Sequence, residues 1–366
     1  MDAIRNRLAE LREQGNFRSI PKHVGDPMID LSSNDYLGLA SDTKAYEEFW
    51  SDRSSQSLPM TSSASRLLAG QQKEYYELEN KLTQLYLRPA LLFNSGYHAN
   101  TGIVSSLADK RTVIIADKLV HASIIDGIKL SGAHFERFRH NDMRHLEKLL
   151  QANVNAARIL LIVESVYSMD GDTAPLDAIV DLKRRYPQAL LMVDEAHAIG
   201  VLGTHGLGLA LPYGNDIDVI MGTMGKALAS MGAFCITNSD IRNYLINSAR
   251  SFIFSTSLPP VNCAWSSLMI DKMLAADDRR EHLQELATHL NAILSAKSYN
   301  TPISHIQPMI VGDAKRALSL AAKLRDNDII ALPIRVPTVP PGTERIRFSL
   351  SAALSHSDLD KLQASL

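Results

Sequence analysis

Between about residues 90 and 240, short apolar runs alternate with amphipathic segments. The runs, such as RTVIIAD, ARILLIVES and ALLMVDEA, are rich in Val, Ile and Leu and have the length of buried strands. The segments between them, such as LDAIVDLKRRYP, have apolar residues at helical spacing. This alternation predicts an α/β fold in which helices cover both faces of a mostly parallel sheet.

The pattern changes near residue 265, where long helical stretches precede the strand-like IRVPTVPPGTERIRFSLSA. We therefore expect a large domain at residues 46–262 and a smaller α+β domain at residues 263–366. Residues 1–45 begin with an amphipathic helix and lack the alternating pattern, so we expect them to pack on the small domain.

Composition restricts the class of protein. The 366 residues are 45% hydrophobic and 21% charged, as in an ordinary globular protein. A net charge of -2 argues against a nucleic-acid partner. Cys235 and Cys263 stand in or beside apolar stretches, which fits buried thiols in a reducing compartment. No apolar run approaches the roughly 18 residues that cross a bilayer, and no signal-peptide core is present, so we expect a cytoplasmic protein without a membrane partner.

Two residues of complementary chemistry follow neighbouring strands of the predicted sheet. Asp194 ends the run ALLMVDEA, and Lys226 follows the run DIDVIMGT about one βα unit later. The carboxyl ends of parallel strands share one edge of a sheet, so both side chains can face one ligand. Pyridoxal phosphate needs such a pair, because a carboxylate keeps its pyridine nitrogen protonated and a lysine binds its aldehyde carbon. Taken singly, Asp194 could equally cap the following helix, and Lys226 would more often be a solvated charge.

Two further stretches could complete a cofactor site. Ser95, Gly96 and Tyr97 stand where a strand gives way to a helix, and the amides of a helix N-terminus attract a phosphate group. His121 follows another strand and could stack on a pyridine ring. A simple turn and a loop histidine are the commoner interpretations of these features alone.

Histidines 134, 140 and 145 raise the alternative of a metal site. No pair of them has the i, i+4 spacing that places two ligands on one helix face. Asn141 or Asp142 more plausibly caps the helix that follows. We therefore expect no metal.

The ordered motifs of the chain resemble those of the α-oxoamine synthases. These are fold-type I enzymes that use pyridoxal 5′-phosphate to condense an amino acid with an acyl thioester, with loss of CO₂. The motifs extend over nearly the whole chain and are SNDYLGLA, SSASRLLAG, FNSGYHAN, DKLVHASIIDG, ESVYSMDGDTAPL, VDEAHAIGVLGTHGLG, GTMGKALASMGA and FIFSTSLPP. The resemblance implies a mostly parallel seven-stranded sheet in the large domain, flanked by helices, and a smaller C-terminal α+β domain.

The resemblance also implies roles for individual residues at the cofactor. Lys226 would hold the cofactor covalently and move the α-proton, Asp194 would pair with the pyridine nitrogen, and His197 would pair with the phenolic oxygen. His121 would stack on the ring and donate a hydrogen bond to the acyl donor. The other implied contacts are Ser95, Gly96, Tyr97 and Thr223 at the phosphate, Ser168 at the phenolic oxygen, Glu164 in support, and Ser255 and Thr256 at the phosphate of a neighbouring subunit. The last two imply a homodimer with shared active sites.

Substrate contacts are implied elsewhere in the chain. Arg347 matches the arginine that binds the substrate carboxylate, a task suited to a guanidinium group, and Asn34 would assist it. Without the resemblance, Arg347 would be a strand arginine in a surface ion pair. Thr338 and Arg18 align with positions on the acyl-donor side.

Four reactions of the family compete. They join alanine to a pimeloyl thioester, glycine to acetyl-CoA, glycine to succinyl-CoA, or serine to a long-chain acyl thioester. The stretches SHIQPMIVGD and IRVPTVPPGTERIRFSLSA most resemble the members that use L-alanine and pimeloyl-CoA or pimeloyl-acyl carrier protein in biotin biosynthesis. A non-catalytic partner subunit would be expected to lack the cofactor lysine, whereas this chain has Lys226.

Overall fold

The computed structural model describes residues 1–20, 28–51, 58–68 and 72–366, and the chain forms two compact units. The large unit comprises Gly38–Tyr167 and Thr173–Asp277, and the small unit comprises Met1–Leu37, Ser168–Asp172 and Asp278–Leu366. Part of the motif SSASRLLAG, residues 69 and 70, lies outside the described residues.

The boundaries of these units differ from the expected domains 1–45, 46–262 and 263–366. Helix α10 (Pro260–Leu274) packs against α3 (Lys73–Tyr86) and therefore belongs to the large unit. The short segment Ser168–Asp172 interrupts the large unit and joins the small one, where Arg345 binds the carboxylate of Asp170 at 2.7 Å.

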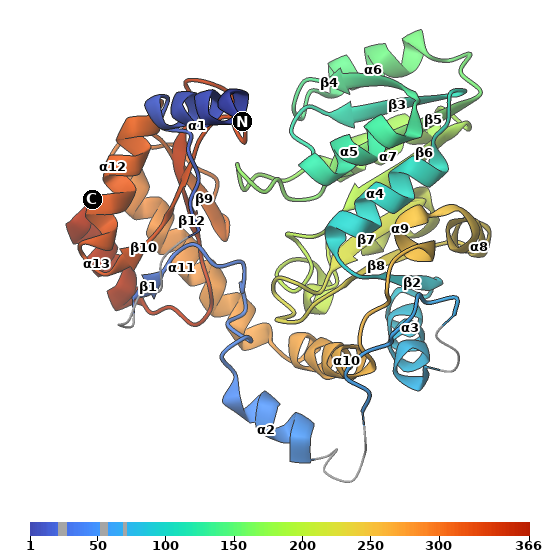
Figure 1. The fold of residues 1–366 in the computed structure, drawn as a ribbon, viewed down its shortest axis with the longest axis horizontal. Helices are drawn as coiled ribbons and strands as arrows, with labels where there is room; N and C mark the ends of the chain where they lie inside the picture. The colour runs from blue at the N-terminus through green and yellow to red at the C-terminus, as the bar shows by residue number, and fades with distance from the viewer. Residues whose placement is uncertain (21–27, 52–57, 69–71) are drawn as a thin grey trace. The chain divides into compact units, whose positions relative to one another are not determined.

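The large unit contains the predicted seven-stranded sheet (Figure 1). Strand β8 is antiparallel to both of its neighbours, whereas β7, β6, β5, β3 and β4 are mutually parallel. In spatial order the strands are β2 (Ala90–Phe93), β8 (Ala233–Thr237), β7 (Val219–Thr223), β6 (Ala189–Asp194), β5 (Arg158–Glu164), β3 (Thr112–Asp117) and β4 (His134–Phe138). The predicted α/β class is confirmed.

Helices cover both faces of this sheet. On one face lie α4 (Gly96–Leu107), α5 (Ala122–Ser131), α8 (Ser239–Ser248) and α9 (Arg250–Ile253), and they share an apolar core with alternate strand residues such as Leu160, Ile162 and Met192. Helices α3, α6 (Met143–Ala152), α7 (Leu176–Arg184) and α10 pack on the other side, where Tyr86 of α3 contacts the ring of Phe234. Helix α2 (Thr43–Ser51) packs on α10.

The small unit is an α+β structure with two sheets. Strands β11 (Leu332–Ile334), β12 (Arg345–Ser349) and β9 (Ile306–Ile310) form an antiparallel sheet with β12 in the centre. Strand β1 (Ile29–Asp30) pairs in parallel with β10 (Ile329–Ile330), which ties the N-terminal segment to the C-terminal part of the chain. The helices are α1 (Asp2–Glu13), α11 (Asp277–Ala296), α12 (Ala314–Arg325) and α13 (His356–Ser365).

Strand register aligns the ends of three parallel strands at one edge of the large sheet. Glu164 at the end of β5 pairs with Asp194 at the end of β6, and Asp194 pairs with Met221 of β7. Side chains that follow these strands are therefore brought together, at the position where open α/β sheets bind ligands.

The structure also shows the state of the two cysteines and whether a described helix could span a membrane. Cys235 on β8 and Cys263 on α10 are free and buried, and burial raises the pKa of each thiol to about 12. Within the described ranges, no helix is both long enough and apolar enough to cross a membrane.

Candidate active site

Lys226 and His197 meet at the carboxyl edge of the large sheet. Lys226 lies in the loop that follows β7, and its Nζ is 2.8 Å from Nε2 of His197. His197 is buried, with 5% of its surface exposed, and it lies in the turn that follows β6. The imidazole therefore limits where the lysine amine can move.

Asp194 is held in place through both of its carboxylate oxygens. Oδ1 accepts the backbone N–H of Ala196 at 2.9 Å, and Oδ2 accepts Nδ2–H of Asn100 at 2.8 Å. Asn100 also donates to the hydroxyl of Ser123, and its own Oδ1 has no hydrogen-bond partner in the described part of the chain. The buried carboxylate is thus oriented before any ligand binds.

His121 and Glu164 form a second oriented pair. The backbone N–H of His121 donates to Oε1 of Glu164, and Nδ1 of His121 accepts the backbone N–H of Ser123 at 3.2 Å, which caps α5. The pKa of Glu164 is raised well above its ordinary value by burial and by the charge of Asp194. His121 is exposed as a residue, yet the surrounding protein desolvates its ring enough to lower its pKa. A neutral His121 can therefore stack on a ring and serve as a hydrogen-bond donor or acceptor.

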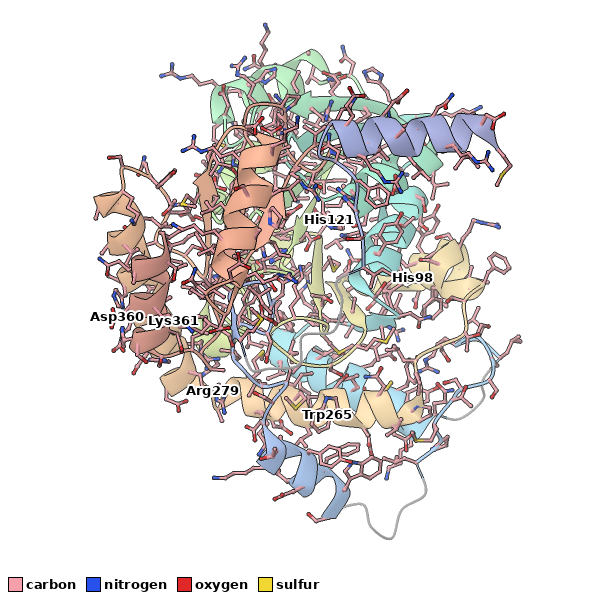
Figure 2. All side chains as sticks on the ribbon, turned by 60° about the vertical axis from the view of Figure 1, so that its left-hand side comes forward. His98, His121, Trp265, Arg279, Asp360 and Lys361 are labelled. Atoms are coloured by element: carbon pink, nitrogen blue, oxygen red, sulfur yellow. The ribbon has the colours of Figure 1, made fainter. Side chains whose placement is uncertain are left out.

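The N-terminus of α4 supplies backbone amides to the same region. Ser95 caps this helix by accepting the N–H of His98 at 3.3 Å; His98 and His121 are both labelled in Figure 2. A Cβ at Gly96 would lie 3.7 Å from the side chain of Thr223, so the helix begins close to the end of β7. Unpaired amides at such a position attract anions.

A cavity of about 180 Å³ lies among these residues. It is lined by Gly96, Tyr97, Asn100, His121, Ser123, Glu164, Asp194, Ala196, His197, Met221, Thr223 and Lys226. A buried carboxylate, an amine, a neutral imidazole and a helix N-terminus around one cavity match the groups that pyridoxal phosphate requires. The residues present therefore fit this cofactor.

Some predicted cofactor contacts do not line this cavity. Ser255 and Thr256 follow α9, where Nδ2 of Asn94 donates to Oγ of Ser255 at 2.8 Å and to the carbonyl oxygen of Thr256. Ser95 acts as the helix cap described above. Tyr97 does line the cavity, although its hydroxyl donates to Asp126 at 2.6 Å.

In the small unit, Arg347 is a buried cation with neutral partners. Its Nε donates to the carbonyl oxygen of Ser168 at 2.6 Å, and one terminal nitrogen donates to Oδ1 of Asn34 at 3.2 Å. The hydroxyl of Tyr36 lies 3.5 Å from that nitrogen. Only 3% of the surface of Arg347 is exposed. Its hydrogen-bond partners among the residues that the structure describes are neutral, and a buried guanidinium in such surroundings is suited to an anionic ligand.

Arg18 and Thr338, the two residues expected on the acyl-donor side, are in contact. A terminal nitrogen of Arg18 donates to the hydroxyl of Thr338 at 2.9 Å. The sequence alone could not place these residues together, because they are far apart in the chain.

Sequence reasoning did not single out Asn100, Ser123 or Tyr36. Asn100 belongs to the quoted motif FNSGYHAN and stands about one helical turn after Gly96, on the side of α4 that faces the sheet. That spacing was the available signal, because residues one turn apart share a helix face. Ser123 and Tyr36 lie beside residues that were singled out, and nothing in their sequence context distinguishes them.

Known proteins match this chain over nearly its full length. A family model described as aminotransferase class I and II matches residues 26–366. A protein of Haemophilus ducreyi named 8-amino-7-oxononanoate synthase is 45% identical, and the alignment covers 100% of both chains.

Two solved structures share the fold. A structure of SPT, serine palmitoyltransferase, with PLP is 29% identical with a TM-score of 0.89, covering 100% of this chain and 96% of that chain. The crystal structure of 8-amino-7-oxononanoate synthase from Francisella tularensis is 30% identical with a TM-score of 0.79, covering 92% of this chain and 96% of that chain. Because these neighbours have different names, the fold by itself does not distinguish their reactions.

Proposed function

The chain belongs to the aminotransferase class I and II family, and within it we propose that the protein condenses L-alanine with a pimeloyl thioester. The products are 8-amino-7-oxononanoate, CO₂ and the free thiol, in biotin biosynthesis. The observation that carries this proposal is the 45% identity, over the full length of both chains, to a protein named for that product. The SPT structure is 29% identical to this chain, although its TM-score of 0.89 exceeds the 0.79 of the synthase from Francisella tularensis.

The cofactor is pyridoxal 5′-phosphate. When bound, it supplies an electron sink for the negative charge that develops at the α-carbon of the amino acid. Lys226 would hold its aldehyde carbon, the carboxylate of Asp194 would keep its ring nitrogen protonated, and the N-terminus of α4 with Thr223 would bind its phosphate. His197 would donate to its phenolic oxygen.

Lys226 moves the α-proton in this proposal. Its Nζ lies 2.8 Å from Nε2 of His197, so the amine is directed by a hydrogen bond to a residue that is itself buried. A positioned amine that takes and later returns the proton acts as a general base and then a general acid. His121 and Glu164 assist by fixing a neutral imidazole at the edge of the cavity, where it can donate to the carbonyl oxygen of the thioester.

Arg347 binds the carboxylate of alanine. Its guanidinium is buried and directed by Ser168 and Asn34, and its hydrogen-bond partners are neutral, which supports a role in binding an anion. Arg18 and Thr338 contact the acyl donor in this proposal, and their mutual hydrogen bond supports a shared location. The donor is carried by CoA or by acyl carrier protein.

We further infer a homodimer in the cytoplasm. Ser255 and Thr256 do not line the cavity of their own chain, which fits the expectation that they contact the cofactor phosphate of a neighbouring subunit.

Thiol release tests the reaction. Cofactor-loaded protein is mixed with L-alanine, glycine or L-serine, each paired with pimeloyl-, acetyl-, succinyl- or palmitoyl-CoA or with pimeloyl-acyl carrier protein. We expect release with alanine and the pimeloyl donor. Release only with glycine, or only with serine and palmitoyl-CoA, would assign the chain to another reaction of the family, and no release with any CoA or acyl-carrier donor would contradict an acyltransferase.

A further inference from the structure

Three imidazoles and two carboxylates converge where α11 and α13 approach each other in the small unit. His282, Glu285 and His289 lie at i, i+3 and i+7 on α11, which places them on one side of that helix. His356 is the first residue of α13, and Asp360 follows it by about one turn. Ser355 and Asp358 form a capping box that fixes the start of α13, and therefore the backbone of His356.

Three of these side chains present ligand atoms at distances close to those of a metal site. Oε2 of Glu285 lies 3.7 Å from Nδ1 of His282 and 3.9 Å from Nε2 of His356. Ligand atoms of the three residues all lie within 4.8 Å of one another. Bonds of 2.0–2.1 Å to a tetrahedral zinc ion place ligand atoms about 3.4 Å apart, so small side-chain rotations suffice. The three side chains are 34%, 66% and 51% exposed, which leaves room for these rotations.

The hydrogen bonds of His282 leave the correct nitrogen available. Nε2 of His282 lies 2.8 Å from the carbonyl oxygen of Leu354, which can only accept a hydrogen bond. Nε2 therefore carries the proton, and Nδ1 presents its lone pair beside Glu285.

Hydrogen bonds that run from Asp360 through His289 likewise leave a nitrogen of His356 available to a metal ion. Nε2 of His289 lies 3.3 Å from a carboxylate oxygen of Asp360, so it carries a proton and leaves Nδ1 of His289 as an acceptor. That Nδ1 is 3.0 Å from Nδ1 of His356, which must then be the donor. The lone pair of Nε2 of His356 is thereby directed to the side of Glu285. Metal-binding histidines characteristically donate their second N–H to a carbonyl, a carboxylate or another fixed acceptor.

We propose that His282, Glu285 and His356 bind one Zn²⁺ ion, with water completing its coordination, and that His289 and Asp360 position His356. Two imidazoles and one carboxylate suit zinc and its neighbours in the transition series, whereas Ca²⁺ and Mg²⁺ require mainly oxygen ligands. The ion joins two helices that are distant in sequence. Because it binds only the folded chain, it stabilises the small unit.

This site could not be predicted from the amino-acid sequence. Histidines 134, 140 and 145, which suggested a metal, have other partners: Nδ1 of His140 contacts the carboxylate of Asp117, and Nδ1 of His145 accepts the N–H of Arg139. The proposed site departs from the expectation of no metal, because its ligands on α11 and α13 come together only in the folded chain.

Calorimetric titration with Zn²⁺ tests the proposal on tag-free, cofactor-loaded protein that has been treated with a chelator. We expect one ion per chain with a dissociation constant below about 10 μM, and a rise in the melting temperature. His356→Ala and Glu285→Gln should each weaken binding more than tenfold. Asp360→Asn, which removes only the support for His289, should weaken it about tenfold.

His134→Ala is the matched control, since it removes an exposed histidine that pairs with Glu136 far from these helices in sequence. Its affinity for Zn²⁺ should equal that of the wild-type chain. The proposal is wrong if the wild-type chain binds no stoichiometric zinc below about 1 mM. It is equally wrong if His356→Ala and Glu285→Gln leave the affinity unchanged, or if His134→Ala reduces it as much as they do.

Discussion

The amine of Lys226, which contacts His197, has two tasks in the proposed reaction. Lys226→Ala removes both the attachment point of the cofactor and the group that moves the α-proton. We expect thiol release to fall by at least about 10²-fold, because a positioned acid/base contributes that much or more. Borohydride reduction followed by peptide mass analysis should find the cofactor on Lys226 in the wild-type chain and on no lysine in the variant.

Lys129→Ala serves as the control for this experiment. Lys129 lies on α5, is exposed and pairs with Asp126, so its loss should leave thiol release and cofactor attachment unchanged. A reducible lysine adduct that persists in Lys226→Ala would refute the assignment of this residue.

The role of a site residue could be predicted from the sequence where few residue types can perform that role. An acid and a lysine after neighbouring strands favour a pyridoxal phosphate site, and the resemblance of the ordered motifs to a known family implies the role of each residue there. Asn100 and Ser123 could not be found in this way, because amides and hydroxyls occur throughout helices and loops. Their importance comes from side-chain hydrogen bonds, of Asn100 to Asp194 and of the Ser123 hydroxyl to His121, that form only in the folded chain.

At the scale of elements, the loop between β6 and β7 depends on one glycine. Gly208 has φ of +90°, and a Cβ there would lie 2.4 Å from a carboxylate oxygen of Glu195. That carboxylate accepts the N–H groups of Leu209 and Ala210, so it cannot move away without losing both bonds. We expect Gly208→Ala to lower the free energy of unfolding by about 2–3 kcal/mol, measured by urea denaturation.

Gly132→Ala separates backbone strain from the collision. Gly132 also has a positive φ, +67°, but a Cβ there would meet nothing within 4 Å. Its substitution should cost only about 1 kcal/mol. An equal decrease in the free energy of unfolding in the two variants would contradict the role assigned to the contact with Glu195.

Glu195 also makes the stability of this loop depend on pH. Burial raises its pKa to about 7, above the ordinary value of 4.5, so the folded chain binds a proton that the unfolded chain releases between these values. The resulting stabilisation is complete below about pH 4.5 and is lost as the pH rises to about 7, by up to roughly 3 kcal/mol.

Comparison with Glu195→Gln isolates this effect, because the variant cannot titrate at that position. The difference in unfolding free energy between wild type and variant should move against the wild type from pH 4.5 to 7 and then stay level. A difference that is constant across this range would show that Glu195 keeps the same charge in both states.

Element type was predictable, but the packing of each element was not. The inner strands of the large sheet, such as β5 and β6, are apolar on both faces, and this pattern has few interpretations. The edge strand β4, with the sequence HFERF, is largely polar and lacks that pattern. Helix α10 was assigned to the small domain, although it packs on α3, since a helical pattern does not identify the neighbour that it contacts. The transfer of Ser168–Asp172 to the small unit likewise depends on tertiary contacts such as that of Asp170 with Arg345.

For the whole molecule, the proposed homodimer predicts complementation between two inactive chains. Lys226→Ala lacks the cofactor lysine, and the double variant Ser255→Ala/Thr256→Ala lacks the groups assigned to a neighbour's phosphate. After subunit exchange in an equal mixture, half of the dimers are mixed and each contains one intact site. We therefore expect up to about a quarter of wild-type thiol release.

Light scattering should find a dimer in each preparation, which is the necessary control. If the mixture regains no activity although mixed dimers are present, Ser255 and Thr256 serve their own subunit or neither. Recovery in Lys226→Ala alone would indicate contamination with active enzyme.

The class of the whole fold followed from the sequence, because alternation of strands and helices leaves few topologies. The meeting of α11 with α13, which creates the proposed zinc site, did not. Long-range packing is set by many weak contacts that no local pattern records.

The burial of Cys235 and Cys263 has a practical consequence for measuring the reaction. With thiol pKa values of about 12, both residues are almost entirely protonated at neutral pH, and a protonated thiol is a poor nucleophile. A colorimetric disulfide reagent can therefore be present throughout turnover and should report the coenzyme thiol over a nearly flat protein background. Because the native thiols of Cys235 and Cys263 react poorly, one engineered surface cysteine could also carry a spectroscopic label without labelling of these two residues.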